Sequence, residues 1–375
     1  NNAYNPTTNP IPQVYGIVGD DFTGVKEVQV SIQDLDAVNW YWKGSDWGSS
    51  ETRFWIPLTV ANGYLSSGAT YWWYGGPVST PTWVSGHRYL VVTKGIDNAN
   101  NEQSVFPVNI SSNTFSYDSQ APTVVITRPI EAVPVPVYSK MSTISGTAAD
   151  DFSGVTEVRV RISYLLDTVT YYWQGGGGPL YWSSMTATEH LTTGTTDWTY
   201  THTKFQDGSA WTGKDGYLFR VEAKAKDKAE NWTTWKLNSF IYDSLPPTIT
   251  LNYPLADKVY KNLPQVTGVA QDNESRIQRV DLLLQDMMYP TTYYNGSTWV
   301  VSGEPLYFSI GNYDSSYVEW TWSIPTPSST LTDTHRYKVK ARAIDAAGST
   351  STVTGDRFFY DDKTVPASTV ILPQE

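Results

Sequence analysis

The chain has 375 residues and no cysteine, and its 26 Lys and Arg against 37 Asp and Glu give a formal net charge of −11. So acidic a chain is a poor partner for phosphate backbones and anionic membranes, and no apolar run approaches the roughly 18 residues of a spanning helix. Nucleic-acid binding and membrane insertion are therefore not expected. Aromatic residues reach 14% and charged residues only 17%, a composition that favours strands and turns.

A turn followed by a strand occurs three times along the chain. Residues 19–28 read Gly-Asp-Asp-Phe-Thr-Gly-Val-Lys-Glu-Val, return as residues 149–158 and, more weakly, as residues 271–280. Apolar residues then alternate with Lys, Glu, Gln and Arg, as they do from Val25 to Ile32. This period of two is that of a half-buried strand. The chain is therefore built from a repeated unit of strands.

Each repeat closes with an aromatic strand that ends in Tyr-Asp or a close variant and is followed by proline, at residues 115–122, 240–247 and 359–366. Several short strands in each repeat, with no helical stripe, predict a two-sheet sandwich. The proline fixes φ and stiffens the joint. The predicted fold class is all-β, with three tandem β-sandwich domains in an elongated array. The predicted boundaries are 1–117, 118–242 and 243–361, with a C-terminal extension at 362–375.

These repeats resemble the bacterial Ig-like and fibronectin type III-like modules of large secreted and cell-surface proteins. The resemblance rests on the Tyr-Asp-x-x-Ala-Pro joint, the Asp-Asp-x-Ser-Gly-Val turn and the Tyr-Trp-x-Gly hairpins that begin at Tyr41 and Tyr172, and it covers essentially the whole chain. It implies Ig-like sandwiches and an extracellular location at the cell surface. It says little about the task of any one member.

The two ends of the chain are complementary. Modules two and three open with strands at residues 123–129 and 248–254, for which module one has no counterpart, whereas residues 366–373 repeat this strand after module three. A sandwich that lacks an outer strand exposes backbone groups and apolar core, and the extended tail of another copy can cover both. Because donor and acceptor lie at opposite ends, the contact builds a filament. The predicted donor residues are Ser368, Thr369, Val370, Ile371 and Leu372.

An alternative stays open for the ends: the chain is one period of a giant repeat protein and acts as a passive spacer. Catalysis is not expected in either case. The chain has four histidines and shows no zinc-type His pair, Gly-x-Ser-x-Gly elbow or phosphate loop. Its carboxylate pairs recur in register between repeats, which indicates module architecture. We therefore predict no catalytic residue and no required cofactor.

Calcium is the one candidate ligand among ions. In an Ig-like sandwich, the start of the first strand, the turn after the second strand and the turn before the last strand meet at one end, and hard oxygen ligands suit calcium. The predicted set is Asp118, Asp150, Asp151, Asp227, Glu230 and Asn231. Equivalent sets are Asp243, Asp272, Asn273 and Asp345 in module three, and Asp20, Asp21, Asp97 and Asn98 with an incoming Asp361 or Asp362 in module one. The alternative is that these side chains only cap tight turns.

Tryptophans crowd module one, and an exposed aromatic platform can stack on sugar rings. Trp72 and Trp73 are the candidates for such stacking on a cell-surface glycan, which defines a further alternative function, a carbohydrate-binding adhesin or accessory module. Against this, Trp42 and Trp173 recur in register, which favours a role in cores and subunit contacts. The predicted partners are thus a second copy of the chain and a cell-surface glycan.

Overall fold

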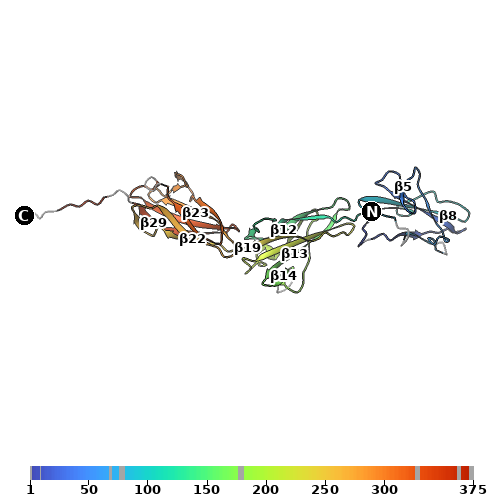
Figure 1. The fold of residues 1–375 in the computed structure, drawn as a ribbon, viewed down its shortest axis with the longest axis horizontal. Helices are drawn as coiled ribbons and strands as arrows, with labels where there is room; N and C mark the ends of the chain where they lie inside the picture. Colours follow the sequence, from blue (N-terminus) through green and yellow to red (C-terminus); the bar gives the residue numbers. More distant parts are fainter. Residues whose placement is uncertain are drawn as a thin grey trace, which may run out of the picture.

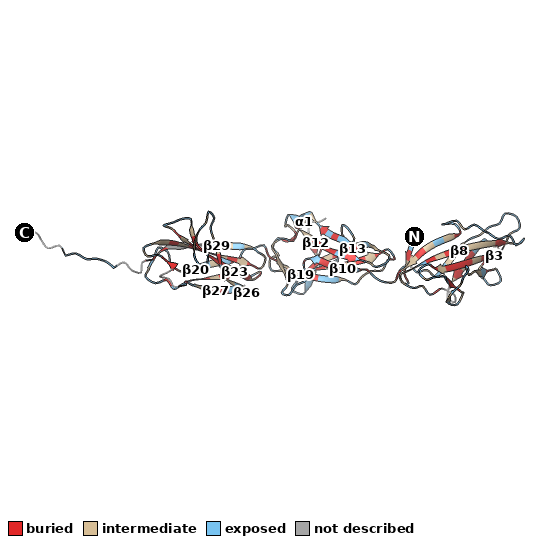
Figure 2. Cartoon of the chain, turned by 90° about the horizontal axis from the view of Figure 1, so that it is seen from above, coloured by how far each residue is buried: buried red, intermediate tan, exposed pale blue. Residues whose placement is uncertain are grey.

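Three β-sandwich modules lie end to end in the computed structural model, which describes residues 2–8, 10–66, 70–75, 81–175, 181–325, 330–360 and 365–370 (Figure 1). The view turned by 90° shows the same line of modules (Figure 2). The N-terminus lies near the joint between modules one and two, and the C-terminal segment extends from the far end of module three. The prediction of an all-β array of tandem sandwiches is confirmed.

Module two shows the complete form of the sandwich. Its larger sheet runs in the order β11 (Val137–Tyr138), β19 (Lys236–Tyr242), β18 (Leu218–Asp227), β13 (Val155–Leu166), β14 (Val169–Trp173) and β15 (Trp182–Ser183), and β16 (His190–Leu191) also pairs with β13. Its smaller sheet runs in the order β10 (Thr123–Arg128), β12 (Thr143–Ala149) and β17 (Asp197–Thr201). A single helical turn, α1 (Thr203–Gln206), follows β17.

Module three repeats this order. Its larger sheet consists of β21 (Val259–Tyr260), β29 (Thr350–Tyr360), β28 (Arg336–Asp345), β23 (Ile277–Asp286), β24 (Thr292–Tyr294) and β25 (Trp299–Val301), with β26 (Phe308–Ser315) on β23. Its smaller sheet consists of β20 (Thr248–Tyr253), β22 (Gln265–Gln271) and β27 (Tyr317–Ser323). In both modules the first strand forms an edge of the smaller sheet.

Among the residues that the structure describes, module one has no such edge strand. Its larger sheet runs in the order β1 (Asn2–Tyr4), β9 (Ser112–Tyr117), β8 (His87–Asp97), β3 (Val25–Asp34), β4 (Trp40–Trp42) and β5 (Trp47–Ser49), with β6 (Ile56–Leu58) on β3. In the described part of the chain, its smaller sheet consists of β2 (Gln13–Ile17) and β7 (Tyr71–Gly75). Within the described residues, β2 therefore pairs on one side alone.

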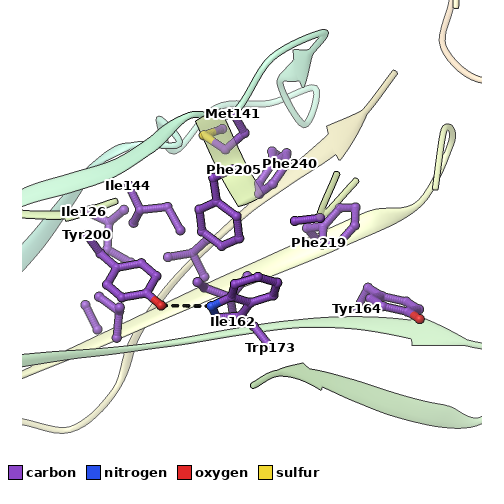
Figure 3. Packing of buried hydrophobic residues seen from close by; sticks show 14 of the residues in the cluster. Ile126, Met141, Ile144, Ile162, Tyr164, Trp173, Tyr200, Phe205, Phe219 and Phe240 are labelled. Atoms are coloured by element: carbon purple, nitrogen blue, oxygen red, sulfur yellow. Dashed lines mark hydrogen bonds between the residues drawn. The ribbon is translucent and has the colours of Figure 1, made fainter. Parts of the chain in front are cut away.

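The module cores are rich in aromatic residues, and in modules one and two a buried hydrogen bond links the two sheets. In module two, the indole N–H of Trp173 donates to the hydroxyl of Tyr200 at 2.8 Å inside the sandwich (Figure 3). In module one, Trp42 donates to Tyr74 at the same distance. Since a buried indole N–H needs an acceptor, this pair fixes how the two sheets face each other. Trp42 and Trp173 are thus core residues, as their recurrence in register predicted.

Among the described residues, none of the helical segments has the length and apolar character that a membrane-spanning helix requires.

Candidate functional site

Three carboxylates meet at the joint between modules one and two. Asp118 follows β9 of module one, Asp150 begins the turn after β12, and Asp227 ends β18. One oxygen of each lies within 4.8 Å of one oxygen of the other two. The strand order causes this meeting, because the closing strand of one module delivers its aspartate to the end of the next sandwich where both turns lie. Asp118 and Asp227 are each only 1% exposed.

The joint between modules two and three is built in the same way. Asp243 follows β19, Asp272 follows β22, and Asp345 ends β28. Their carboxylate oxygens also lie within 4.8 Å of one another, and all three side chains are buried. Two equivalent joints thus carry equivalent clusters, which we call the joint clusters.

In the joint-cluster aspartates Asp118 and Asp345, one carboxylate oxygen caps a turn by accepting a backbone hydrogen bond. Oδ1 of Asp118 accepts from the backbone N–H of Gln120 at 3.0 Å, and Oδ1 of Asp345 accepts from that of Ser349 at 2.7 Å. The capping alternative is therefore correct for these atoms. It leaves the second oxygen of Asp118, Asp243 and Asp345, each of which is buried without a hydrogen-bond partner. A buried acceptor without a partner costs free energy unless a ligand satisfies it.

The electrostatics of the joint clusters are unfavourable without a cation. Burial, reinforced by the neighbouring carboxylates, raises the pKa of Asp227 and Asp243 above the usual aspartate value and that of Asp345 to about 6. Among the described residues, no Lys or Arg forms a salt bridge with any of the six carboxylates. Like charges in a dry site favour either protonation or the binding of a positive ion.

The geometry suits a divalent cation with oxygen ligands. Calcium binds carboxylate oxygens at about 2.3–2.6 Å, so ligands on opposite sides of one ion stand about 4.6–5.2 Å apart. In each joint cluster the carboxylate oxygens lie within 4.8 Å of one another, close enough for a single ion to contact all three. Aspartates are hard ligands, and neither joint cluster contains the His or Cys that softer metals prefer.

Three residues of the predicted calcium set have other positions. Asp151 and Glu230 are exposed and lie outside the joint cluster. Only the first aspartate of the Asp-Asp turn faces the joint, and Glu230 occupies a tight turn with a positive φ of 73°. Asn231 acts as a donor: its Nδ2 reaches the carbonyl oxygen of Asp118 at 2.9 Å and Oδ2 of Asp227 at 2.7 Å. Asn231 therefore ties the two modules together directly.

Further contacts cross both joints. The side chain of Asn5 donates to the carbonyl oxygen of Ala229, and the hydroxyl of Thr8 donates to that of Glu230 at 3.2 Å. At the second joint, the hydroxyl of Ser139 donates to the carbonyl oxygen of Ala347 at 3.3 Å. The turn before the last strand thus receives hydrogen bonds from the preceding module in both cases.

At the end that faces away from module two, module one has aspartates at two of the three positions that form a joint cluster elsewhere. Asp20 and Asp97 correspond to Asp150 and Asp227, but no closing strand precedes them in the described chain. Their hydrogen bonds to local turn groups lower the pKa of both, in contrast to the raised pKa of Asp227. The predicted third partners, Asp361 and Asp362, lie outside the described residues.

A groove opens at this same end of module one. It has a volume of about 500 Å³ and lies between the small sheet and the larger one, with Val18, Val28, Trp72, Ile96 and Ile110 among its lining residues. In module two the corresponding space is occupied by β10, whose Ile126 is 4% exposed. The groove is therefore the place of the strand that module one lacks.

Module one has the same residue types as module two at two positions that, in module two, make room for the first strand and bind it. Gly146 lets β10 approach, since a Cβ there would stand 2.0 Å from the carbonyl oxygen of Val125, and Gly16 holds the same position in β2. Asn238 clamps β10 by donating to the carbonyl oxygens of residues 126 and 129 at 3.1 and 2.9 Å. Its counterpart in β9, Asn113, is exposed.

The C-terminal segment is extended and solvent-exposed. Residues 365–370 pair with no strand among the described residues, and Val370 is 88% exposed. Of the predicted donor residues, Ser368, Thr369 and Val370 lie in this segment, and Ile371 and Leu372 lie outside the described residues.

Trp72 is not available for sugar stacking, so this prediction was wrong. Alternation along β7 turns Trp72 and Tyr74 into the core, where Trp72 is 6% exposed and lies beneath Gly16. Trp73 points outward and is half-buried. Adjacent residues of a strand face opposite sides, so a Trp-Trp pair cannot form one platform.

Sequence reasoning missed a recurring histidine–aspartate contact. His87 Nδ1 lies 2.7 Å from Oδ2 of Asp34, and His335 Nδ1 lies 2.8 Å from Oδ2 of Asp286. Both pairs join the last residue of a central strand to the start of its neighbour. Their recurrence at equivalent places marks them as part of the sandwich, and the repeated His-Arg-Tyr in the sequence is the signal that could have found them.

No family model and no curated protein matches the chain. Among solved structures it is similar to the fibronectin(III)-like modules of Clostridium thermocellum CbhA, with 14% identity over 66% of this chain and 100% of that one and a TM-score of 0.34. A 1.5-MDa bacterial ice-binding adhesin is 12% identical over 94% of this chain and 91% of that one, with a TM-score of 0.31. Chicken CNTN1 FN1-FN3 domains are 8% identical over 90% and 91%, with a TM-score of 0.25. The description of the chain as tandem β-sandwich modules rests on the strand order described above.

Proposed function

We propose that the chain is a non-enzymatic structural subunit of an extracellular filament or surface fibre, in which the C-terminal strand of one copy fills the groove of module one in the next. The observation that carries this proposal is the groove itself. It lies where modules two and three bury their first strand, and Gly16 and Asn113 hold the two places that accommodate and clamp that strand elsewhere.

The positions of the two ends favour a linear assembly. In module two, β10 enters from the end that carries Asp150 and Asp227, so the strand that fills module one would enter beside Asp20 and Asp97. This end faces away from module two, and the C-terminal segment leaves from the opposite end of the array (Figure 1). Such a contact is heterologous and adds copies along one axis.

We further propose that each joint cluster holds one calcium ion, which would stiffen the array. The unpartnered buried oxygens of Asp118, Asp243 and Asp345 support this role. An ion held by both modules would couple the closing strand of one to the turns of the next. Free joints would bend, whereas occupied joints would keep the modules in line.

Deletion of residues 366–375 tests the filament, read by negative-stain microscopy and sedimentation. The full chain should form filaments, and the deleted chain should stay monomeric because residues 365–370 stabilise no part of their own copy. Filaments from the deleted chain would rule out strand insertion. A full chain that stays monomeric at high concentration would instead favour the passive spacer of a longer repeat protein.

A carbohydrate-binding adhesin or accessory module is the second candidate function. The outward Trp73 and the exposed Tyr15 and Tyr71 beside it favour this candidate. Binding on a glycan array that is lost on substitution of Trp73 by Ser would support it.

A further inference from the structure

The outer face of the small sheet in module one is apolar. Across β2 and β7, Tyr15 stands opposite Trp73, and Ile17 stands opposite Tyr71. Tyr15, Ile17 and Tyr71 are 73%, 78% and 61% exposed. We call these four residues the aromatic patch. It borders the unpaired edge of β2.

The sandwich fold does not require this patch. The equivalent cross-strand pairs are Ser145 with Thr199 and Thr147 with Asp197 in module two, and Thr267 with Thr321 and Val269 with Glu319 in module three. Seven of these eight residues are polar. Contiguous exposed apolar residues on one module of a soluble chain mark an interaction surface.

The sequence of the C-terminal segment sets a register on β2. Two prolines seven residues apart bracket each opening strand, at positions 122 and 129, 247 and 254, and 366 and 373. This alignment places Thr369 at the position of Val125 and Val370 at that of Ile126. Val125 pairs with the third residue from the end of β12 and Ile126 with Gly146. The same register would place Thr369 opposite Ile17 and Val370 opposite Gly16, with the Val370 side chain in the groove.

In that register the outer faces also match. In module two the hydroxyls of Thr127 and Ser145 contact each other at 3.2 Å. At these two positions the C-terminal segment carries Ile371 and module one carries Tyr15. In this register, an apolar contact between copies would replace the polar contact found within module two.

We infer that the aromatic patch selects the C-terminal segment of a second copy, which adds to β2 with Thr369 opposite Ile17. This inference rests on the proposed function and names its specificity-determining surface. The opening strands of modules two and three carry Thr127 and Asn252 where the C-terminal segment carries Ile371, so they would leave the patch uncovered. Specificity of this kind separates the joint between copies from the joints within one copy.

Engineered disulfides can test this register. Because the chain has no cysteine of its own, only the introduced residues can form them. Opposed residues of antiparallel strands lie within disulfide range, whereas a slip of two residues places the Cα atoms beyond about 7 Å. The full chain with Ile17→Cys and Thr369→Cys should form a ladder of reducible multimers under oxidation. The matched pair Ile17→Cys and Ala367→Cys, which is displaced by two residues along the C-terminal segment, should not. Equal ladders from both pairs would overturn the register.

A second test measures how much the aromatic patch contributes to binding of the C-terminal segment. The chain without residues 366–375 is titrated into a fluorescent peptide of that sequence, and the anisotropy is measured. Tyr15→Ser combined with Trp73→Thr should weaken binding at least tenfold, and the exposed control Tyr317→Ser in module three should leave it unchanged. Equal binding by the patch variant would overturn this inference while strand insertion stands. Peptide that binds neither chain would overturn the proposed function itself.

Discussion

Replacement of Asp345 by Asn should remove the pH dependence that this carboxyl gives to module three and should weaken the response of the module to calcium. In the chain without calcium, burial raises the pKa of this carboxyl from 3.8 to about 6. The folded state therefore holds the proton more tightly than the unfolded state. Below pH 3.8 both states are protonated and no penalty exists. Stability is lost as the pH rises from there through 6, because the unfolded carboxyl ionises first.

The size of this effect follows from the difference between the two pKa values. One pKa unit corresponds to about 1.36 kcal/mol, so ionisation of Asp345 costs the folded chain about 3 kcal/mol at pH 7. Asp345→Asn removes this cost. Calcium at a hundredfold excess over its Kd would add about 2.7 kcal/mol to the native chain, and the variant, with a weakened site, would gain less.

Differential scanning calorimetry of the full chain can test both signs. In EDTA, the transition of module three should occur at a higher temperature in Asp345→Asn than in the native chain at pH 7, and the gap should close by pH 3.5. Excess calcium should narrow this gap at pH 7, because the native chain gains more than the variant. Asp97→Asn is the matched control in module one, where turn hydrogen bonds lower the pKa, so its loss should destabilise at pH 7. Parallel pH curves for native and Asp345→Asn chains, or no calcium response in either, would refute the reasoning.

Three more substitutions follow from the structure. Gly146→Ala should cost about 1–3 kcal/mol by chemical denaturation, because a Cβ there meets the backbone of β10 at 2.0 Å, whereas Gly19→Ala, with nothing within 4 Å, should be neutral. Asn113→Ala should leave the melting of the free chain unchanged, since the exposed amide would find its partners only in the joined state. It should weaken binding of the peptide 366–375 about tenfold, roughly 1.4 kcal/mol. Unaltered binding would contradict this role. Trp173→Phe should cost about 1–3 kcal/mol, because it leaves the buried hydroxyl of Tyr200 without its donor, and a melting curve like that of the native chain would contradict it.

Local pattern explains why much of the fold could be predicted. The alternation from Val25 to Ile32 depends only on neighbouring residues. The repeated closing motif, Tyr-Asp followed a few residues later by proline, marks where each module ends. The turn aspartates Asp150 and Asp272 are recognisable because a tight turn needs a nearby acceptor for its backbone N–H groups. Recurrence of these signals three times, at similar spacing, is what allowed tandem sandwiches to be predicted.

Whether a side chain faces the core or the solvent depended on strand register, which the sequence left open around β7. Trp72 and Trp73 are adjacent and chemically alike, yet one lies beneath Gly16 and the other faces outward. The same applies to Asp150 and Asp151, of which only the first joins a joint cluster. One residue of difference in phase changes the face, and no local signal sets that phase when both neighbours are the same residue type.

The amino-acid sequence by itself determined the repeated strands, the carboxylates at each joint and the resemblance of the C-terminal segment to an opening strand, because each is written in contiguous residues. Only the tertiary structure decided that an oxygen of Asp118, Asp243 and Asp345 is buried without a partner, and that β2 borders an open groove. Burial is a property of groups brought together from distant parts of the chain, so it depends on how the sheets and modules pack.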